Sequence, residues 1–197
     1  MNVAEDLSSA SSEHVQLRAA VDAIRAGNKD AYAIVIRLYQ KRLFGLALMF
    51  VRDRAAAEDV VQEALVRAYT HLDRYEEIRD FYPWIATITV RLAQNWRRNR
   101  ANKSAPETDE PQAEIEASDD VLAEVIADEG AAKLWRAVNR LAQGERAAVV
   151  LFYQHDMKLN DVAQVLGVTP GSVKTLLFRA REKLRNQIGS MSFTNRI

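Results

Sequence analysis

The sequence predicts an all-α protein made of two small helical domains joined by a flexible acidic linker. Glycine and proline are few, and long stretches repeat apolar residues with the 3.6-residue period of a helix rather than the alternation of a strand. The pattern breaks over residues 103–120, where two prolines and many carboxylates replace bulky apolar side chains. A segment of that composition is typical of a linker between domains.

These features divide the chain into five segments. Residues 1–14 are expected to form a disordered tail, residues 15–102 a first helical domain, and residues 103–120 the linker. Residues 121–190 are expected to form a second helical domain, and residues 191–197 a final tail. A length of 197 residues is enough for two small domains.

Four helices are expected in the first domain, at about residues 15–26, 29–51, 54–72 and 81–100. Asn28 or Asp30 is suited to cap the second helix, because short polar side chains accept hydrogen bonds from free backbone N–H groups. The apolar side of that helix is expected to contain Ala33, Ile36, Leu43, Ala47 and Phe50.

Composition argues against several classes of protein. The chain has no cysteine, which excludes disulfides, thiolate metal sites and cysteine nucleophiles and fits a reducing compartment. Neither a signal peptide nor a run approaching 18 apolar residues is visible, so we expect a cytoplasmic protein without membrane insertion. Because 27 basic residues balance 27 acidic ones, only the distribution of charge can indicate a polyanionic partner.

The sequence predicts no catalytic residue, no metal site and no cofactor. His14, His71 and His155 are widely separated and lack an acidic residue at metal-ligand spacing. The sequence also contains no glycine-rich phosphate loop and no serine-nucleophile motif. We therefore expect a protein that is not an enzyme.

Residues 144–187 are predicted to form a helix-turn-helix. Its first helix should end at Gly167, a residue type that tolerates positive φ, and Val168 is expected to pin the turn. Thr169 is a natural N-cap, and Pro170 suits the first position of the second helix because no N–H is needed there. The expected inner faces are Val162, Ala163, Leu166, Val173, Leu176, Leu177, Ala180 and Leu184.

The outer face of the second helix is expected to bind the DNA major groove. Early side chains of such a helix reach base edges, while flanking cations neutralise phosphates. A merely solvated basic face is the alternative, but the glycine turn and the Thr-Pro start are more specific than charge alone. The expected contact residues are Ser172, Lys174, Thr175, Arg179, Arg181 and Lys183.

The helix within residues 55–75 has two distinct faces. Its inner face should contain Val60, Val61, Ala64, Leu65, Ala68 and Leu72. Its outer face carries Asp59, Gln62, Glu63 and Val66 at the i, i+3, i+4, i+7 spacing of a helical stripe. Spacing alone favours ordinary solvated surface, with a grip on a basic partner helix as the alternative.

The following segment, residues 81–100, is strongly basic. Its cations suit contact with a phosphate backbone, and nearby rings suit stacking on unpaired bases. Trp84 is interpreted as a core residue. The cations are Arg91, Arg97, Arg98, Arg100 and the adjacent Lys103, and the rings are Tyr75, Phe81, Tyr82 and Trp96.

Across nearly its whole length the sequence resembles the bacterial RNA polymerase sigma factors of the extracytoplasmic-function (ECF), RpoE-like group. AEDVVQEALVRAY at residues 57–69 is similar to the region-2 helix of that family, and FYPWIATI at residues 81–88 to the motif that follows. GSVKTLLFRAREKLR at residues 171–185 resembles the region-4 recognition helix. The acidic linker lies where the group has a variable connection.

The resemblance implies a factor that binds core RNA polymerase and directs promoter-specific transcription initiation. The first domain would be sigma region 2, which binds the core enzyme and opens the −10 element of promoter DNA. The second would be sigma region 4, which reads the −35 element and touches the polymerase flap. An anti-sigma factor would hold the protein inactive, within a stress or envelope response.

The resemblance also implies roles for single residues. Those facing the clamp helices of the largest polymerase subunit would be Asp59, Gln62, Glu63 and Val66. Those binding −10 DNA would be His71, Asp73, Arg74, Tyr75, Arg91, Asn95 and Arg98, with residues 71–79 receiving a flipped base. Phe178 would join the −35 contacts.

Four positions depart from the pattern of the family. Arg91 and Asn95 stand where the group usually has asparagine and aspartate, and Ala142 and Lys158 where it usually has proline and a serine cap.

Two other classes of non-enzymatic protein remain as alternatives. The second domain also resembles the LuxR-type helix-turn-helix of conventional regulators, which would predict an α/β domain upstream. The upstream sequence has no βαβ alternation and carries the motif at residues 57–69, which favours the sigma factor. A purely interactive helical protein is the other alternative.

Overall fold

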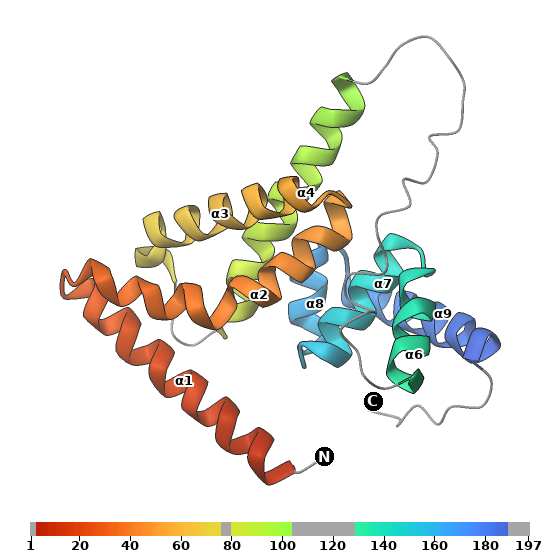
Figure 1. Cartoon of the computed structure of the whole chain (residues 1–197), viewed down its shortest axis with the longest axis horizontal. Coiled ribbons are helices and arrows are strands. Elements are labelled where there is room, and N and C mark those ends of the chain that lie inside the picture. Colours follow the sequence, from red (N-terminus) through yellow and green to blue (C-terminus); the bar gives the residue numbers. More distant parts are fainter. Residues whose placement is uncertain (1–2, 76–79, 104–128, 189–197) are drawn as a thin grey trace. The chain divides into compact units, whose positions relative to one another are not determined.

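The computed structural model describes residues 3–75, 80–103 and 129–188, and in these ranges every regular element is helical (Figure 1). The chain divides into two compact units, Met1–Arg98 and Asn99–Ile197. The predicted all-α class is therefore confirmed. Of the predicted linker only Lys103 is described, as the last residue of a helix, and the predicted tail at residues 191–197 lies outside the described residues.

The first unit begins with a helix longer than the sequence predicts. α1 spans Val3–Arg25, so it includes residues 3–14, which were expected to be a disordered tail. No glycine or proline interrupts the sequence before Gly27, and the helix can therefore continue through that segment. The remaining elements are the 3-10 turn η1 (Lys29–Ala31), α2 (Tyr32–Val51), α3 (Arg54–Thr70), the 3-10 turn η2 (Leu72–Arg74) and α4 (Phe81–Lys103).

Two short corners join the first three helices. Gly27 has a φ of +98°, and the Asn28 side chain accepts a hydrogen bond of 3.1 Å from the Asp30 N–H, which confirms Asn28 as a cap. Arg52 ends α2 in the left-handed conformation, with a φ of +53°. Asp53 then caps α3 by accepting a hydrogen bond of 3.0 Å from the Ala56 N–H.

α2 lies at the centre of the unit and contacts both α1 and α3 (Figure 1). Because it is packed from two sides, its apolar residues do not follow a single narrow stripe. Leu43, Ala47 and Phe50 are buried as predicted, but Ala33 is exposed and Ile36 is only half-buried. The buried face of α3 agrees fully with the predicted one: Val60, Val61, Ala64, Leu65 and Ala68, followed by Leu72 of η2.

Aromatic rings connect α2, Tyr75 directly after η2, and α4. The Tyr75 ring lies edge-on to Phe81, with 4.9 Å between centroids, and 5.5 Å from the ring of Trp84. Tyr39 packs against Phe81 at 5.3 Å and stacks on Tyr82 at 5.9 Å. Burial raises the pKa of the Tyr82 hydroxyl above its ordinary value, so this side chain stays neutral within the core.

The second unit is built around its last helix. α6 (Glu129–Asn139), α7 (Gln143–Val149), the π-helical turn η3 (Val150–Gln154) and α8 (Leu159–Leu166) precede α9 (Pro170–Ile188). α9 contacts α6, α7 and α8, and its buried side contains Val173, Leu177, Ala180 and Leu184. α8 and α9 together form the predicted helix-turn-helix.

The turn between α8 and α9 follows the sequence prediction closely. Gly167 ends α8 with a φ of +69°, and the Thr169 hydroxyl accepts a hydrogen bond of 3.2 Å from the Ser172 N–H. The side chain of Val168 is 40% exposed, so its contribution to the turn comes from its backbone, whose N–H donates a hydrogen bond of 3.0 Å to the Ala163 carbonyl. Val165 is buried, whereas Leu166 is only half-buried.

Candidate functional site

One exposed surface lies on α3. Asp59, Gln62 and Val66 all face solvent, and Val66 is 55% exposed. Within the described part of the chain, the side chains of Asp59 and Gln62 make no hydrogen bond or ion pair. Glu63 differs, because its carboxylate accepts a hydrogen bond of 2.7 Å from Arg67 Nε on the same helix. An exposed valine beside an unpaired carboxylate suits a protein partner rather than DNA.

A second surface is the turn η2. The side chains of His71, Asp73 and Arg74 are exposed, whereas Leu72 and Tyr75 are buried. The turn therefore presents three polar side chains outward and fixes two apolar ones in the core.

Burial overturns one part of the prediction for this region. Tyr75, Phe81 and Tyr82 expose only 5%, 2% and 6% of their surface, so their rings are not available to stack on bases. The sequence could not distinguish these rings from exposed ones, because they are covered by one another and by Tyr39 of α2, which is distant in the sequence. Trp96 is half-buried.

A third surface is the outer face of α4. Arg91, Asn95 and Arg98 are exposed and spaced four and three residues apart, which places them on one side of the helix. Arg98 Nη2 donates a hydrogen bond of 2.8 Å to Asn95 Oδ1. Arg97 and Arg100 are also exposed. This helix therefore presents a dense row of cations that suits a phosphate backbone.

The fourth surface is the outer face of α9. The ring of Phe178 is 61% exposed there. Lys174 and Arg179 are exposed as well, and neither makes an ion pair within the described residues. Thr175 is exposed, although its hydroxyl donates a hydrogen bond of 3.1 Å to the Gly171 carbonyl. Ser172 lies exposed at the start of the helix. Donors and cations at the exposed start of the second helix are what major-groove reading requires.

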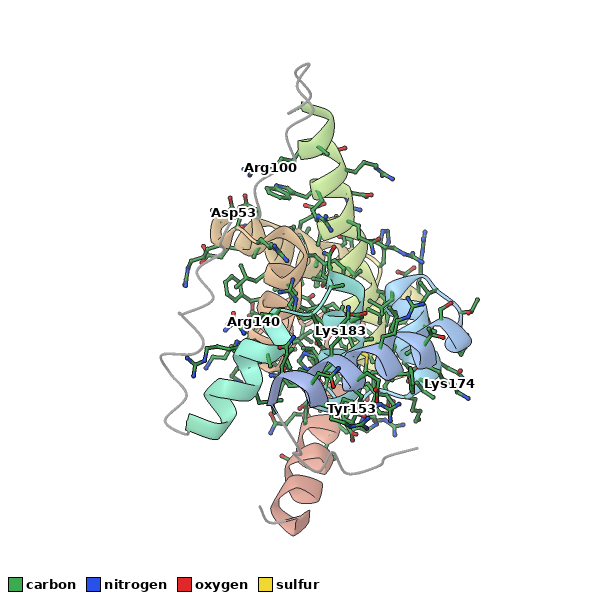
Figure 2. All side chains as sticks on the ribbon, turned by 90° about the vertical axis from the view of Figure 1, so that its right-hand side faces the viewer. Asp53, Arg100, Arg140, Tyr153, Lys174 and Lys183 are labelled. Carbon is green, nitrogen blue, oxygen red and sulfur yellow. The ribbon has the colours of Figure 1, made fainter. Side chains whose placement is uncertain are left out.

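Two of the predicted α9 contact residues have partners inside the unit. Arg181 is half-buried, and its Nε atom donates a hydrogen bond of 3.3 Å to the Leu177 carbonyl. Lys183 Nζ lies 2.8 Å from Oε2 of Glu145, a buried residue of α7. Figure 2 shows Lys174 and Lys183 at different positions along α9. Lys183 therefore takes part in the packing of α7 against α9, although its side chain remains half-exposed.

Sequence reasoning missed Glu145 and Arg146, the two buried charged residues of α7. The Glu145 carboxylate accepts a hydrogen bond of 3.3 Å from the Ala142 N–H, and Arg146 Nη1 donates one of 3.1 Å to the Asn139 carbonyl. A glutamate three residues after a helix start is a capping signal, and it could have identified Glu145. Lys158 caps α8 without a side-chain hydrogen bond, consistent with the absence of a serine there.

Two classes of site are not found in the described part of the chain. No cluster of three or more histidine, aspartate or glutamate side chains there is arranged to hold a metal ion. In the same ranges, no helix combines the length and apolarity needed to cross a membrane.

The fold and these surfaces together define a helical protein with a helix-turn-helix in one unit and an exposed basic helix in the other. Comparison with known families is consistent with this class. Residues 35–103 match the family model of Sigma-70 region 2, and residues 131–184 match that of Sigma-70, region 4.

Individual relatives agree with the family models. The chain is 29% identical over 173 residues to the RNA polymerase sigma-H factor of Pseudomonas aeruginosa, covering 83% of this chain and 89% of that protein. It is 27% identical over 186 residues to the ECF RNA polymerase sigma factor SigW of Bacillus subtilis, covering 88% of this chain and 97% of that protein.

Two solved structures share the fold. The sigma factor RpoE in its co-crystal structure with the anti-sigma factor NepR from Bartonella quintana matches with a TM-score of 0.59 at 19% identity, covering 80% of this chain and 96% of that one. CnrH, in complex with the cytosolic domain of CnrY, also matches with a TM-score of 0.59, at 23% identity, covering 91% of this chain and 99% of that one.

The chain therefore belongs to the ECF RNA polymerase sigma factors and has both sigma-70 region 2 and region 4. As a member of this family it directs transcription initiation, and because the family is non-catalytic, the prediction that the chain is not an enzyme is confirmed.

Proposed function

We propose that the protein reads a promoter at two sites. Residues 15–102 bind core RNA polymerase and open the −10 element, and residues 121–190 bind the −35 element and touch the polymerase flap. The observation that carries this proposal is the presence of a DNA-suited surface on each of the two compact units: α4 with η2 in the first, and α9 in the second.

Polymerase binding falls to the outer face of α3. Asp59 and Gln62 offer polar groups without a partner in the described structure, and Val66 adds exposed apolar area. Glu63 is already engaged by Arg67, so it joins this interface only by exchanging that partner. Their partner is the clamp helices of the largest polymerase subunit.

Opening of the −10 element falls to η2 and α4. Extruding one base from the duplex costs a few kcal/mol, which contacts to the extruded base can offset. His71, Asp73 and Arg74 are exposed on η2 and supply those contacts. Arg91 and Arg98 hold the backbone, since Arg–phosphate attraction is independent of sequence.

Recognition of the −35 element falls to the first half of α9. Ser172, Lys174 and Thr175 reach base edges or phosphates near the start of the helix, with Phe178 and Arg179 one turn further along. Arg181 and Lys183 contribute less directly, because both side chains already have partners inside the unit.

Run-off transcription with purified core polymerase tests the whole proposal. Core enzyme supplied with this protein should produce discrete transcripts from a subset of genomic promoter fragments, whereas core enzyme alone should not. A correctly folded protein that gives no promoter-specific transcript with active core enzyme contradicts the proposal.

We also propose that an anti-sigma factor binds this protein in the cytoplasm. The support is that the sigma factor RpoE, which shares its fold, was solved in complex with the anti-sigma factor NepR. Affinity purification of the tagged chain from its own host, followed by run-off transcription with the recovered partner, tests this. The partner should abolish the transcript, and a partner that leaves transcription unchanged contradicts the proposal.

A further inference from the structure

The last turn of α1 contacts the segment that follows η2. Arg25 Nη2 donates a hydrogen bond of 2.9 Å to the carbonyl oxygen of Tyr75, 50 residues further along the chain. The Tyr75 N–H in turn donates a hydrogen bond of 3.2 Å to the Leu72 carbonyl, which closes the 3-10 turn. The guanidinium of Arg25 therefore holds the end of the turn that presents His71, Asp73 and Arg74.

The inner side of the same turn is fixed by packing. Leu72 and Tyr75 are buried, and the Tyr75 ring lies against the rings of Phe81 and Trp84 at the start of α4. Apolar packing fixes the position of the turn, and the Arg25 hydrogen bond fixes the peptide at its end. Recognition groups held by such a supporting shell bind with a smaller loss of conformational entropy.

α1 is a firm support because it is anchored at a second point. Leu17, Ala20 and Val21 are buried in the unit. Further toward its start, the Glu13 carboxylate forms an ion pair of 3.2 Å with Arg42 of α2. The Arg42 guanidinium also lies 3.9 Å from the centroid of the Tyr82 ring. Arg25 therefore extends from a helix whose position is set independently of η2.

We propose that Arg25 is a positioning residue for promoter opening: it holds η2 in the orientation in which His71, Asp73 and Arg74 capture the −10 element. This inference rests on the proposed function of η2. Arg25 also lies in the last turn of α1, where a cation interacts favourably with the helix dipole, and that role is purely structural. The test must therefore separate positioning from stability.

The test uses the full chain bound to core polymerase and a promoter identified by run-off transcription. The probe is the single-stranded non-template oligonucleotide of its −10 region. Arg25→Ala should weaken binding of this oligonucleotide by roughly ten-fold, the equivalent of one charge-assisted hydrogen bond. The affinities for core polymerase and for −35 duplex DNA should remain those of the wild type.

Two variants provide the controls. Lys29→Ala removes an exposed cation of η1 and should bind the oligonucleotide like the wild type. Arg25→Lys retains a charged donor at the same position and should restore part of the lost affinity.

A double-mutant cycle identifies how Arg25 acts. When the exposed residues of η2 are already replaced, as in His71→Ala/Asp73→Ala/Arg74→Ala, adding Arg25→Ala should have little further effect. If the losses of oligonucleotide affinity are additive, and Arg25→Ala lowers the salt dependence of that affinity by about one phosphate contact, Arg25 binds DNA directly and the proposal is overturned. A matching loss of core affinity indicates a structural role and overturns it as well.

Failure of this inference is distinct from failure of the proposed function. A wild-type holoenzyme that makes no specific transcript contradicts the function itself. An active wild type, together with an Arg25→Ala variant that matches Lys29→Ala, contradicts only the role of Arg25.

Discussion

Lys183 of α9 and Glu145 of α7 form an ion pair in which both carboxylate oxygens accept from one ammonium group. Nζ lies 2.8 Å from Oε2 and 2.9 Å from Oε1. The Glu145 side chain is only 7% exposed, whereas that of Lys183 is 50% exposed. A carboxylate buried to this degree requires a partner, since an unpaired buried charge is strongly unfavourable. The pair therefore joins the start of α7 to the second half of α9.

We predict that Lys183→Met destabilises the protein without changing how its DNA affinity depends on salt. Removing the ammonium leaves the buried Glu145 carboxylate without a counter-ion, with only the Ala142 N–H as a donor among the described residues, which should lower the free energy of unfolding by about 2 kcal/mol. Urea unfolding of the full chain measures that loss, and fluorescence anisotropy with −35 duplex DNA across a salt series measures the phosphate contacts.

Lys174→Met is the matched control for that prediction. Lys174 is exposed on the same helix and has no partner within the described residues, so its loss should change stability by less than about 0.5 kcal/mol. It should lower the salt slope by about one phosphate contact. An equal drop in slope for Lys183→Met would show that Lys183 binds DNA after all.

The outer face of α3 gives a second prediction. The double variant Asp59→Ala/Gln62→Ala should weaken binding to core polymerase by roughly ten-fold or more, because two interface side chains are truncated together. Binding of the −35 duplex should not change, since α9 belongs to the other unit. Surface-immobilised core enzyme measures the first affinity and anisotropy the second.

Glu58→Ala is the control on the same helix. Glu58 is also exposed, but it accepts a hydrogen bond of 3.1 Å from Arg54 and lies outside the Asp59 stripe. Its replacement should leave core affinity within two-fold of the wild type, a change of about 0.4 kcal/mol. Core binding that is lost equally in both variants would point to general acidity rather than to this face.

The conformation of Gly167 gives a third prediction. Its φ is +69°, and no atom lies within 4 Å of the place that a Cβ would occupy. Gly167→Ala should therefore destabilise the protein only through the strained backbone conformation of the alanine. The cost should be about 1 kcal/mol in free energy of unfolding. Gly45→Ala is the contrasting variant. Gly45 lies within α2, also has no atom within 4 Å of the place that a Cβ would occupy, and does not have a positive φ.

Gly45→Ala should therefore stabilise its own unit by about 0.5–1 kcal/mol. Thermal unfolding, monitored by circular dichroism, measures whether each variant is less or more stable than the wild type. The explanation by conformation fails if the two alanine variants shift stability in the same direction.

Local signals in the sequence were sufficient to predict the helix-turn-helix and the two faces of α3. The Gly167 turn and the Thr169 cap depend on residues a few positions apart, so the sequence contains all the relevant information. The two faces of α3 were predictable because its apolar and polar residues separate cleanly, with Val60 buried and Asp59 exposed.

Features that depend on distant contacts were not predictable. Ala33 was expected in the core, but α2 is apolar on most sides and its orientation is decided by α1 and α3. The sequence predicts an exposed ring at Tyr75, but in the structure the rings of Phe81 and Trp84 cover it. The sequence predicts a DNA-contacting cation at Lys183, but in the structure this side chain is paired with Glu145, which lies 38 residues away in the sequence.

The contact between Asn95 and Arg98 gives a final prediction, about the −10 surface. An amide orients the guanidinium through a 2.8 Å hydrogen bond and leaves its positive charge available to a phosphate. A carboxylate at the same position would form an exposed ion pair instead. We therefore expect Asn95→Asp to lower the affinity of holoenzyme for −10 DNA by roughly two- to five-fold, the equivalent of up to about 1 kcal/mol.

The same surface allows the orienting role to be separated from the charge. Asn95→Ala should weaken binding less than Asn95→Asp, because Arg98 keeps its charge and loses only its preferred direction. In an Arg98→Ala background, Asn95→Ala should have no further effect, since the group that it orients is absent. Anisotropy with a fork-junction promoter measures the wild type and all four variants. Independent, additive losses would mean that Asn95 contacts DNA itself, and Arg98 would then be a neighbour rather than its target.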